Sequence, residues 1–264
     1  WLVERMKIGR LKNIQIVFSL PVRELRRLLI PPDRFVGSEL LTLQNDESHY
    51  LRRVLRLRIG DPLAISDGCG QLWQADVVDE HTVRTHPQPC EQVDQPQPTL
   101  GLAVSIIRRG FDDVVRMGCE LGIDRIQPLR CERTVPQAEY RPDRWNTIVR
   151  EAGEQCERLW KPTVLELNTL NAWLESSSGQ KAFGVTRQQN VRPLIDWLDQ
   201  TAMPQPMTWL IVGPEGGWTS AERDALDKHS VVPIHLGGSI LRTSTAAVAG
   251  AVELVRWREQ QLNS

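Results

Sequence analysis

The sequence predicts an α/β protein with two domains, a small β-barrel followed by a larger domain built on a parallel sheet. At 264 residues the chain exceeds the usual range of about 100 to 200 residues for one domain. Residues 28–95 form short strand-like runs that are broken by turn residues. From residue 96 onward, strand-like runs alternate with helical ones, which is typical of a parallel sheet with helices on both faces.

The first predicted domain spans residues 21–95 and contains a hairpin and a basic helical segment. Asp67 and Gly68 lie between two alternating runs, where a hairpin turn is expected. Residues 46–61 instead place apolar side chains at helical spacing, with arginines between them. Such a helix suits the phosphates of RNA, and the alternative is an ordinary charged surface. The predicted RNA-binding residues of this segment are His49, Arg52, Arg53 and Arg56.

The remaining boundaries follow from segments without periodicity. The proline- and glutamine-rich interval 87–99 is interpreted as a linker, which puts the domain boundary near residue 96. The second predicted domain therefore spans 96–264. Residues 1–20 are mildly basic and lack the apolar segment and cleavage site of a secretory signal, so they are treated as an N-terminal extension of unknown role.

Composition narrows the class of protein. The net charge of −1 means that any polyanionic partner must be recognised by local basic patches. Five cysteines form no C-x-x-C pair, which favours a reducing cytosol over a disulfide framework. No run approaches the roughly 18 apolar residues of a membrane span. No His, Cys and Asp cluster has metal-ligand spacing. We therefore expect a soluble cytoplasmic protein with no metal.

The stretch "LIVGPEGGWTSAE", residues 210–222, predicts a strand, a glycine turn and a capped helix. Thr219 is the expected cap, and Glu222 is expected to reach back to it. Open α/β sheets bind ligands at such places. The stretch is neither a dinucleotide fingerprint nor a phosphate loop. A tight turn that needs glycine for its geometry alone is the alternative.

A second stretch, "HLGGSILRTSTAAVAG" at 235–250, repeats the pattern of apolar approach, glycine pair and helix. The glycines Gly237 and Gly238 end a strand, and small residues open the helix. Two such loops side by side offer main-chain hydrogen bonds and an apolar slot to a planar heterocycle, with Arg242 at its mouth. An adenine-bearing cofactor fits that description.

The paired segments "GPEGGWTSAE" and "LGGSILRTSTAA" resemble the C-terminal signature of the ribosomal RNA small-subunit methyltransferase E family. Four further segments agree in order and spacing: "PPDRF", "HYLRRVLRLRIGD", "ELGIDRIQPLRCERT" and "EAGEQCERLWKP". The resemblance covers about residues 25–258. The family belongs to the trefoil-knotted SPOUT superfamily and methylates N3 of a uridine in 16S rRNA with S-adenosylmethionine.

This resemblance implies a PUA-like RNA-binding barrel, followed by a knotted SPOUT α/β domain that forms homodimers through the knot region. It implies that the substrate is 16S rRNA of the small ribosomal subunit. Arg242 is the candidate catalytic residue, because a cation beside a uracil oxygen favours the deprotonated N3. Arg130 and Arg133 are candidate RNA contacts. The implied cofactor-binding residues are Gly213, Glu215, Gly216, Gly217, Leu236, Gly237, Ile240, Leu241 and Arg242.

The chain departs from the family pattern at two positions. Ser244 stands where a glutamate is usual, and Met117 where a lysine is common. Ser244 is an alternative helix cap. The missing carboxylate leaves the proton acceptor unassigned and motivates a second hypothesis, a non-catalytic RNA-binding or ribosome assembly factor with the same fold. Glu154, Gln155 and Arg158 are expected either to face the substrate cleft or to lie on a solvated helix face.

Overall fold

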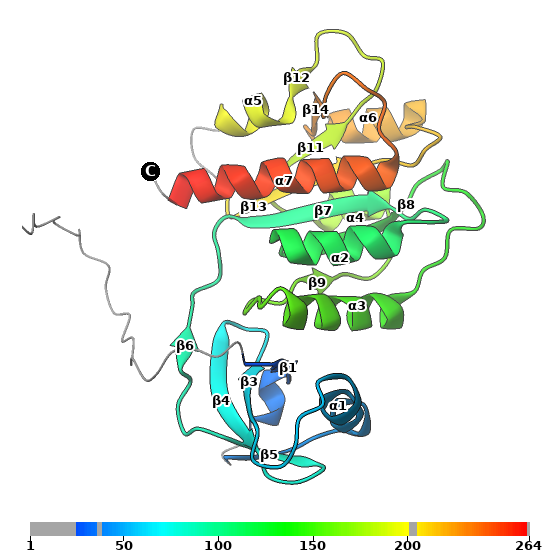
Figure 1. Cartoon of the computed structure of the whole chain (residues 1–264). Coiled ribbons are helices and arrows are strands. Elements are labelled where there is room, and N and C mark those ends of the chain that lie inside the picture. Colours follow the sequence, from blue (N-terminus) through cyan, green and yellow to red (C-terminus); the bar gives the residue numbers. More distant parts are fainter. Residues whose placement is uncertain (1–24, 36–38, 201–204, 263–264) are drawn as a thin grey trace, which may run out of the picture. The chain divides into compact units, whose positions relative to one another are not determined.

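The structure is a computed structural model that describes residues 25–35, 39–200 and 205–262 (Figure 1). It divides into two compact units. The first comprises the chain up to Asp67 together with Gln71–Val93, and the second comprises Gly68–Gly70 and the chain from Asp94 onward. The predicted N-terminal extension, residues 1–20, lies outside the described residues.

A six-stranded sheet forms the first unit, in the order β1-β3-β4-β5-β2 with β6 added to β4. β3 and β4 pair antiparallel from Pro62 opposite Asp76 to Ser66 opposite Leu72, so the predicted hairpin is present. β6 arises from within the interval that the sequence had assigned to a linker. The strands are β1 Arg27–Leu29, β2 Leu40–Thr42, β3 Pro62–Ser66, β4 Gln71–Val77, β5 Thr82–Thr85 and β6 Glu91–Gln92.

The basic segment of this unit is helical but shorter than predicted. A short 3-10 turn, η1 (Pro32–Arg34), precedes it, and α1 (Asn45–His49) then continues as a π-helix, η2 (Tyr50–Val54). The apolar periodicity predicted a stripe that runs on to Leu57. The chain instead turns out of the helix at Arg56, which has a φ of 57°. Val54, an expected member of the buried stripe, is 59% exposed.

The second unit contains an eight-stranded sheet in the order β10-β8-β7-β13-β11-β14-β12, with β9 also paired to β8. All of its strand pairings are parallel. The strands are β7 Thr99–Ser105, β8 Arg125–Arg130, β9 Thr163–Val164, β10 Asn168–Thr169, β11 Gln180–Gly184, β12 Arg192–Pro193, β13 Met207–Val212 and β14 Val232–His235.

Helices cover both faces of this sheet, because side chains alternate along its strands. Leu100, Leu102 and Val104 of β7 pack with α2, α3, α5 and α7, whereas Ala103 packs with α4 and α6. The predicted alternation of strands and helices is therefore present. The helices are α2 Phe111–Leu121, α3 Pro142–Gln155, α4 Leu170–Ser176, α5 Leu194–Asp199, α6 Ser220–Lys228 and α7 Thr243–Leu262.

The last helix, α7, lies along the central strands β7 and β13 (red in Figure 1). Gly250 permits this close approach, since a Cβ there would lie 2.0 Å from Cδ2 of Leu210. The small residues Ala247, Gly250 and Ala251 of this helix are buried in the core of the second unit. The helix begins at Thr243, so Ser244 lies inside the first turn and is not the cap.

A buried ion cluster joins four parts of the second unit. The carboxylate of Asp124 accepts hydrogen bonds from Arg158 at 2.6 Å, from Arg258 of α7 at 2.5 Å, and from the main-chain N–H of Leu100 at 2.8 Å. Asp124 and Arg258 are 6% and 5% exposed. The arginines therefore neutralise a carboxylate that burial alone would destabilise. Among the described residues, no helix is long and apolar enough to cross a membrane.

Candidate functional site

The two glycine-bearing stretches singled out in the sequence meet at one edge of the second sheet. The first follows β13, and the second connects β14 to α7. The hydroxyl of Thr243 donates a hydrogen bond to the carbonyl oxygen of Gly213 at 2.8 Å. The loop at 213–219 is thus hydrogen-bonded to the first residue of α7. This helix follows directly on the loop at 236–242.

The glycines of these loops play two different structural roles. A Cβ at Gly213 would lie 2.8 Å from the Trp218 ring, and one at Gly216 would lie 2.9 Å from Cβ of Arg133. These two glycines shape the turn. Gly217 and Gly237 have φ values of +70° and +128°, and no heavy atom lies within 4 Å of the place where their Cβ would be. Those two positions, with Gly238, border open space that a ligand can fill.

The helix after the first loop has the predicted cap. The hydroxyl of Thr219 accepts a hydrogen bond from the main-chain N–H of Glu222 at 3.2 Å. The Glu222 carboxylate accepts one from the N–H of Thr219 at 3.0 Å and another from the N–H of Glu132 at 2.9 Å. The capping box is therefore confirmed, and it also holds the chain after β8 against the glycine turn.

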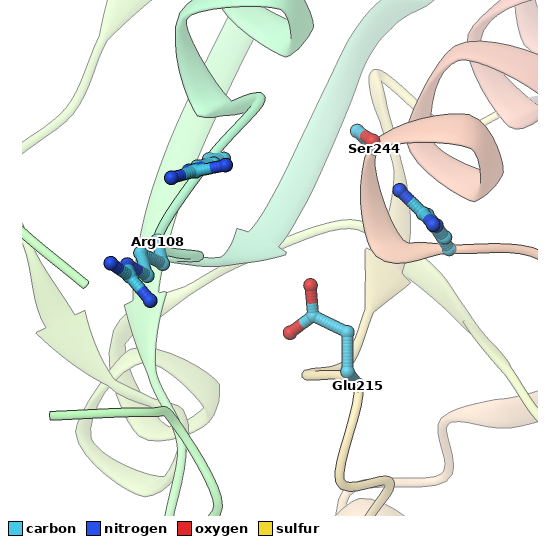
Figure 2. A pocket seen from close by; sticks show the side chains of 5 residues that line it. Arg108, Glu215 and Ser244 are labelled. Carbon is cyan, nitrogen blue, oxygen red and sulfur yellow. The ribbon is translucent and has the colours of Figure 1, made fainter. Parts of the chain in front are cut away.

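A cavity of about 420 Å³ lies where three chain segments meet. Its lining residues come from the loop after β7, from the glycine turn, and from the junction of the loop at 236–242 with the first turn of α7. Figure 2 shows Glu215 directed into the space between Arg108 and Ser244. The residues that line it are Arg108, Arg109, Glu215, Arg242 and Ser244.

The charge of this cavity is unbalanced. Three of its five lining residues are arginines and one is a carboxylate, so its side chains carry a net charge of about +2 at neutral pH. Within the described parts of the chain, no ion pair or side-chain hydrogen bond engages Arg108, Arg109 or Arg242. The guanidiniums are available to an anionic or carbonyl-bearing ligand.

The other predicted cofactor residues lie on the loop between β14 and α7. Leu236 and Leu241 are half-buried, and Ile240 is 60% exposed. The exposed Ile240 offers apolar surface to a ligand that lies against this loop. The loop therefore combines open glycines with apolar side chains.

The predicted RNA contacts fall into two groups. His49, Arg52 and Arg53 lie on α1 and η2 of the first unit, and Arg56 lies just beyond. Arg52 forms an exposed ion pair with Glu80 at 2.8 Å. In the second unit, Arg130 ends β8 and is exposed.

Arg133 has a structural contact at the glycine turn. Its Nη1 donates to the carbonyl oxygens of Gly216 at 2.9 Å and of Trp218 at 3.4 Å. It therefore braces the turn that borders the cavity. Trp218 itself is buried, and its indole N–H donates to the carbonyl oxygen of Gly184 at 3.0 Å. Its ring is part of the core of the second unit.

Of the segment at 154–158, only Gln155 matches an expectation, because it is exposed to solvent at the end of α3. Glu154 is 8% exposed, and Arg158 forms part of the buried ion cluster. Arg158 also donates to the main-chain carbonyls of Cys119 and Ile123 at the end of α2. Burial lowers the pKa of the Arg158 guanidinium. Arg158 therefore stabilises the fold, because its partners are main-chain groups and Asp124.

Sequence reasoning missed Arg108 and Arg109. The sequence does contain a pattern that could have indicated them, because in "VSIIRRG" the two arginines follow directly after the apolar run that forms β7. Carboxyl ends of parallel strands share one edge of a sheet, so the residues after β7 and after β13 were bound to be neighbours once those strands paired. The sequence alone did not reveal which strands pair. No group of three or more His, Cys, Asp or Glu residues suited to a metal ion occurs in the described ranges.

Comparison with known proteins identifies the family. Residues 94–254 match the family model described as an RNA methyltransferase domain, and residues 43–84 match an RNA methyltransferase PUA domain. The chain is 34% identical to ribosomal RNA small subunit methyltransferase E from Synechocystis sp. over 254 residues, with 90% of this chain and 82% of that protein covered. The chain belongs to the ribosomal RNA small subunit methyltransferase E family. The resemblance found in the sequence is thereby confirmed.

Solved structures agree with this family. The enzyme of the same name from Neisseria gonorrhoeae, bound to S-adenosyl methionine, is 26% identical with a TM-score of 0.73, and the match covers 87% of this chain and 96% of that one. A putative methyltransferase from Legionella pneumophila, in complex with the bound cofactor, is 25% identical with a TM-score of 0.73, and the match covers 89% and 98%. The predicted fold class, a knotted SPOUT domain preceded by a PUA-like domain, is confirmed.

Proposed function

We propose that this chain transfers a methyl group from S-adenosylmethionine to N3 of a uridine in 16S rRNA of the small ribosomal subunit. Family membership and the cofactor seen in the Neisseria and Legionella structures support the proposal. The observation that carries it is the junction between Thr243 and Gly213, which places two loops with open glycine positions beside an arginine-rich cavity. We place the activity in the cytoplasm, where ribosomes are assembled.

The residues present fit the cofactor. Open space at Gly217 and Gly237 leaves room for a planar heterocycle against the main chain, and the adjoining loop supplies apolar side chains. We assign the cofactor to the residues named from the sequence. These are Gly213, Glu215, Gly216, Gly217, Leu236, Gly237, Ile240, Leu241 and Arg242.

The chemistry asked of the protein is positioning and charge control. The cofactor supplies an electrophilic methyl group on a sulfonium. The protein must hold uridine N3 in line with that methyl group and stabilise the charge that develops on the uracil oxygens. Arg242 suits the second task, because it lines the cavity and its guanidinium is not engaged by the described residues. A cation beside O2 or O4 favours the deprotonated N3.

Glu215 is our candidate for the group that takes the N3 proton. It is the carboxylate in the cavity lining, and it faces the space between Arg108 and Ser244 (Figure 2). Ser244 has a hydroxyl where relatives of the family usually have a carboxylate, and a neutral hydroxyl cannot replace a carboxylate as the acceptor of the N3 proton. An exposed carboxylate is a weak base at neutral pH, and we therefore expect positioning to contribute more to the rate than proton transfer.

The decisive experiment is methylation of small ribosomal subunits in vitro, with the product mapped at single-nucleotide level. The wild-type chain should produce N3-methyluridine at one site. Arg242→Gln should lower kcat by about two orders of magnitude, as the loss of an electrostatic stabiliser does. A methyl group found on another atom or on no nucleotide would contradict the proposal. Retained S-adenosylmethionine binding in Arg242→Gln, measured by calorimetry, separates catalysis from binding.

A second candidate function is a non-catalytic RNA-binding or assembly factor, which Ser244 favours because it removes a carboxylate from the site. Calorimetry discriminates the two. A chain that binds RNA but shows no S-adenosylmethionine binding is such a factor, whereas micromolar cofactor binding favours the enzyme.

We propose that RNA binding also involves His49, Arg52, Arg53 and Arg56 of the first unit and Arg130 and Arg133 of the second. Arg53 is exposed, and reversing its charge tests the basic helix directly. Arg53→Glu should weaken RNA binding and reduce its salt dependence, with cofactor affinity unchanged. Unchanged RNA affinity would remove this helix from the interface.

We also propose a homodimer formed through the knot region. Ile240 in the loop before α7 and Val252 on α7 are apolar side chains that are 60% and 37% exposed. A second copy that covers them would remove this surface from water. Sedimentation velocity at micromolar concentration should show a dimer, and Val252→Asp should shift it toward monomer. A wild-type chain that sediments as a monomer contradicts the assignment.

A further inference from the structure

We propose that Arg108 and Arg109 bind the phosphates of the RNA strand that flank the target uridine, and thereby position its base in the cavity. The inference rests on the proposed function and extends it to residues that the sequence did not single out. It gives the cavity two parts, one that holds the reacting groups and one that holds the RNA backbone.

The loop that carries the two arginines is held at both ends. On one side, Ile106 and Ile107 are buried, and the N–H of Ile106 donates to the carbonyl oxygen of Leu129 at 2.8 Å. On the other side, Gly110 turns the chain into α2 with a φ of +93°, and a Cβ there would lie 3.4 Å from Oγ of Ser244. The backbone that carries the two arginines is therefore held in place against the first turn of α7. A ligand that binds there pays little conformational entropy to order this loop.

The acids nearest in the chain are engaged with other cations. Asp112 forms an ion pair with Arg144 at 2.5 Å and accepts a hydrogen bond from the indole of Trp145 at 3.0 Å. Asp113 pairs with Arg116 at 3.5 Å. Glu215 alone opposes three guanidiniums in the lining. Like charges held together repel, so this arrangement favours a bound anion.

The anion that suits the place is an RNA phosphate. Both arginines are exposed to solvent, whereas the open glycine positions lie on the two other loops. A target base must leave its stack to reach a methyltransferase site, while its phosphates stay outside. Two adjacent guanidinium forks match phosphate oxygens in geometry and charge. S-adenosylmethionine also carries a carboxylate, and the experiment below distinguishes the two sources.

The test compares Arg108→Gln, Arg109→Gln and the double variant with the wild type. RNA affinity is measured against potassium chloride concentration, KM and kcat are measured with small ribosomal subunits, and cofactor affinity is measured by calorimetry. We expect the double variant to bind RNA about tenfold more weakly. Its plot of log affinity against log salt should be shallower by about 1.4, which is about 0.7 for each lost contact with a single strand. KM for RNA should rise more than kcat falls.

Two further variants separate charge from structure. Arg125→Gln removes an exposed arginine at the start of β8, on the opposite edge of the sheet, and should leave RNA binding and its salt dependence unchanged. Replacing both arginines with lysine, R108K/R109K, retains the point charges and should restore most of the salt dependence, because lysine also contacts phosphate. A merely structural role for the loop would not give this rescue.

Three outcomes overturn the proposal. The first is an unchanged salt dependence and KM for RNA in the double variant. The second is a loss of cofactor affinity with RNA binding intact, which would assign the arginines to the cofactor carboxylate. The third is an equal loss in Arg125→Gln. If the wild-type chain transfers no methyl group, the proposed function fails, and the salt dependence of RNA binding still decides whether the two arginines contact phosphate.

Discussion

Gly217 and Gly60 share a backbone conformation but differ in surroundings that matter for ligand binding. Their φ values are +70° and +86°, and neither has a heavy atom within 4 Å of the place a Cβ would occupy. Any larger residue at either site is strained by about 1 to 3 kcal/mol. Gly217 borders the proposed cofactor space, whereas Gly60 lies in the first unit between η2 and β3. Substitutions at the two glycines therefore separate the effect of backbone strain from the effect of filling the ligand space.

We expect Gly217→Val to lower S-adenosylmethionine affinity by at least tenfold, because its methyl groups occupy the ligand space. Gly60→Val should carry a similar cost in unfolding free energy, measured in urea, and leave the affinity unchanged. Calorimetry gives the affinities. Equal cofactor binding by both variants would show that the space at Gly217 is not used by the ligand.

The thiols of Cys119 and Cys156 interact where the end of α3 meets α2. The side-chain interaction with Cys119 lowers the pKa of the Cys156 thiol, and the same interaction, with burial, raises the pKa of Cys119. The thiolate is the reactive form, and it persists to a lower pH when the pKa is depressed. Cys156 should therefore react with alkylating agents near neutral pH while Cys119 does not.

We expect iodoacetamide to label Cys156 at pH 7 faster than an ordinary thiol, and the rate to fall as the pH is lowered through the depressed pKa. Cys119→Ala removes the interaction that lowers the pKa of Cys156, so that pKa rises and labelling at pH 7 slows. Labelling of the exposed Cys69, followed by peptide mass spectrometry, serves as internal reference. An unchanged Cys156 rate in Cys119→Ala would contradict the assigned cause.

At the scale of elements, the start of α7 connects the helix to the glycine turn. Thr243 is 4% exposed and donates its hydroxyl hydrogen to the carbonyl oxygen of Gly213, while the nearby Thr245 is exposed. Removing one partner of a buried hydrogen bond costs about 1 to 3 kcal/mol, because the other partner is left unsatisfied. Valine has nearly the same shape as threonine and lacks the hydroxyl.

Thr243→Val should lower the unfolding free energy by about 1 to 2 kcal/mol and weaken S-adenosylmethionine binding severalfold. Thr245→Val, on the exposed side of the same turn, should change stability by less than about 0.5 kcal/mol and leave binding unaltered. Urea denaturation and calorimetry measure both quantities. If the two variants behave alike, the hydrogen bond does not organise the site.

The elements that periodicity encodes were predictable. The hairpin around Asp67 and the capping box of Thr219 follow from residues that lie close together in the sequence, so their patterns are visible in it. The π-helix was not predicted, because apolar spacing from Tyr50 to Leu57 fits an α-helix equally well. Backbone geometry, and not side-chain pattern, decided where that helix stops.

The site was predictable only in part, because only some of its residues belong to patterns that are local in the sequence. Its two glycine loops carry local patterns, but Arg108 and Arg109 join them only through the pairing of β7 with β13, which are about a hundred residues apart. Arg158 was expected at a cleft or in solvent, since arginine is seldom buried. Its partner Asp124 lies 34 residues away and gives no local signal.

Across the second unit as a whole, Asp124 connects β7, the residues after α2 and α3, and the end of α7. Breaking a buried ion pair by removing one partner costs about 3 to 5 kcal/mol. Asp124→Asn leaves two buried guanidiniums without their carboxylate, so we expect a loss of that size in urea or thermal unfolding. Asp224→Asn, on the exposed surface of α6, is the matched control and should cost less than about 0.5 kcal/mol. Equal stability of the two variants would show that the cluster contributes little.

The contact between Thr243 and Gly213 also sets a time at which the site becomes complete during synthesis. All eight strands of the second sheet precede residue 236, yet the loop at 236–242 and the helix that fixes it are made afterwards. A growing chain that has only reached His235 can form most of its hydrophobic core but has half of the proposed cofactor site. We therefore expect the growing chain to bind S-adenosylmethionine only after α7 has emerged from the exit tunnel and docked.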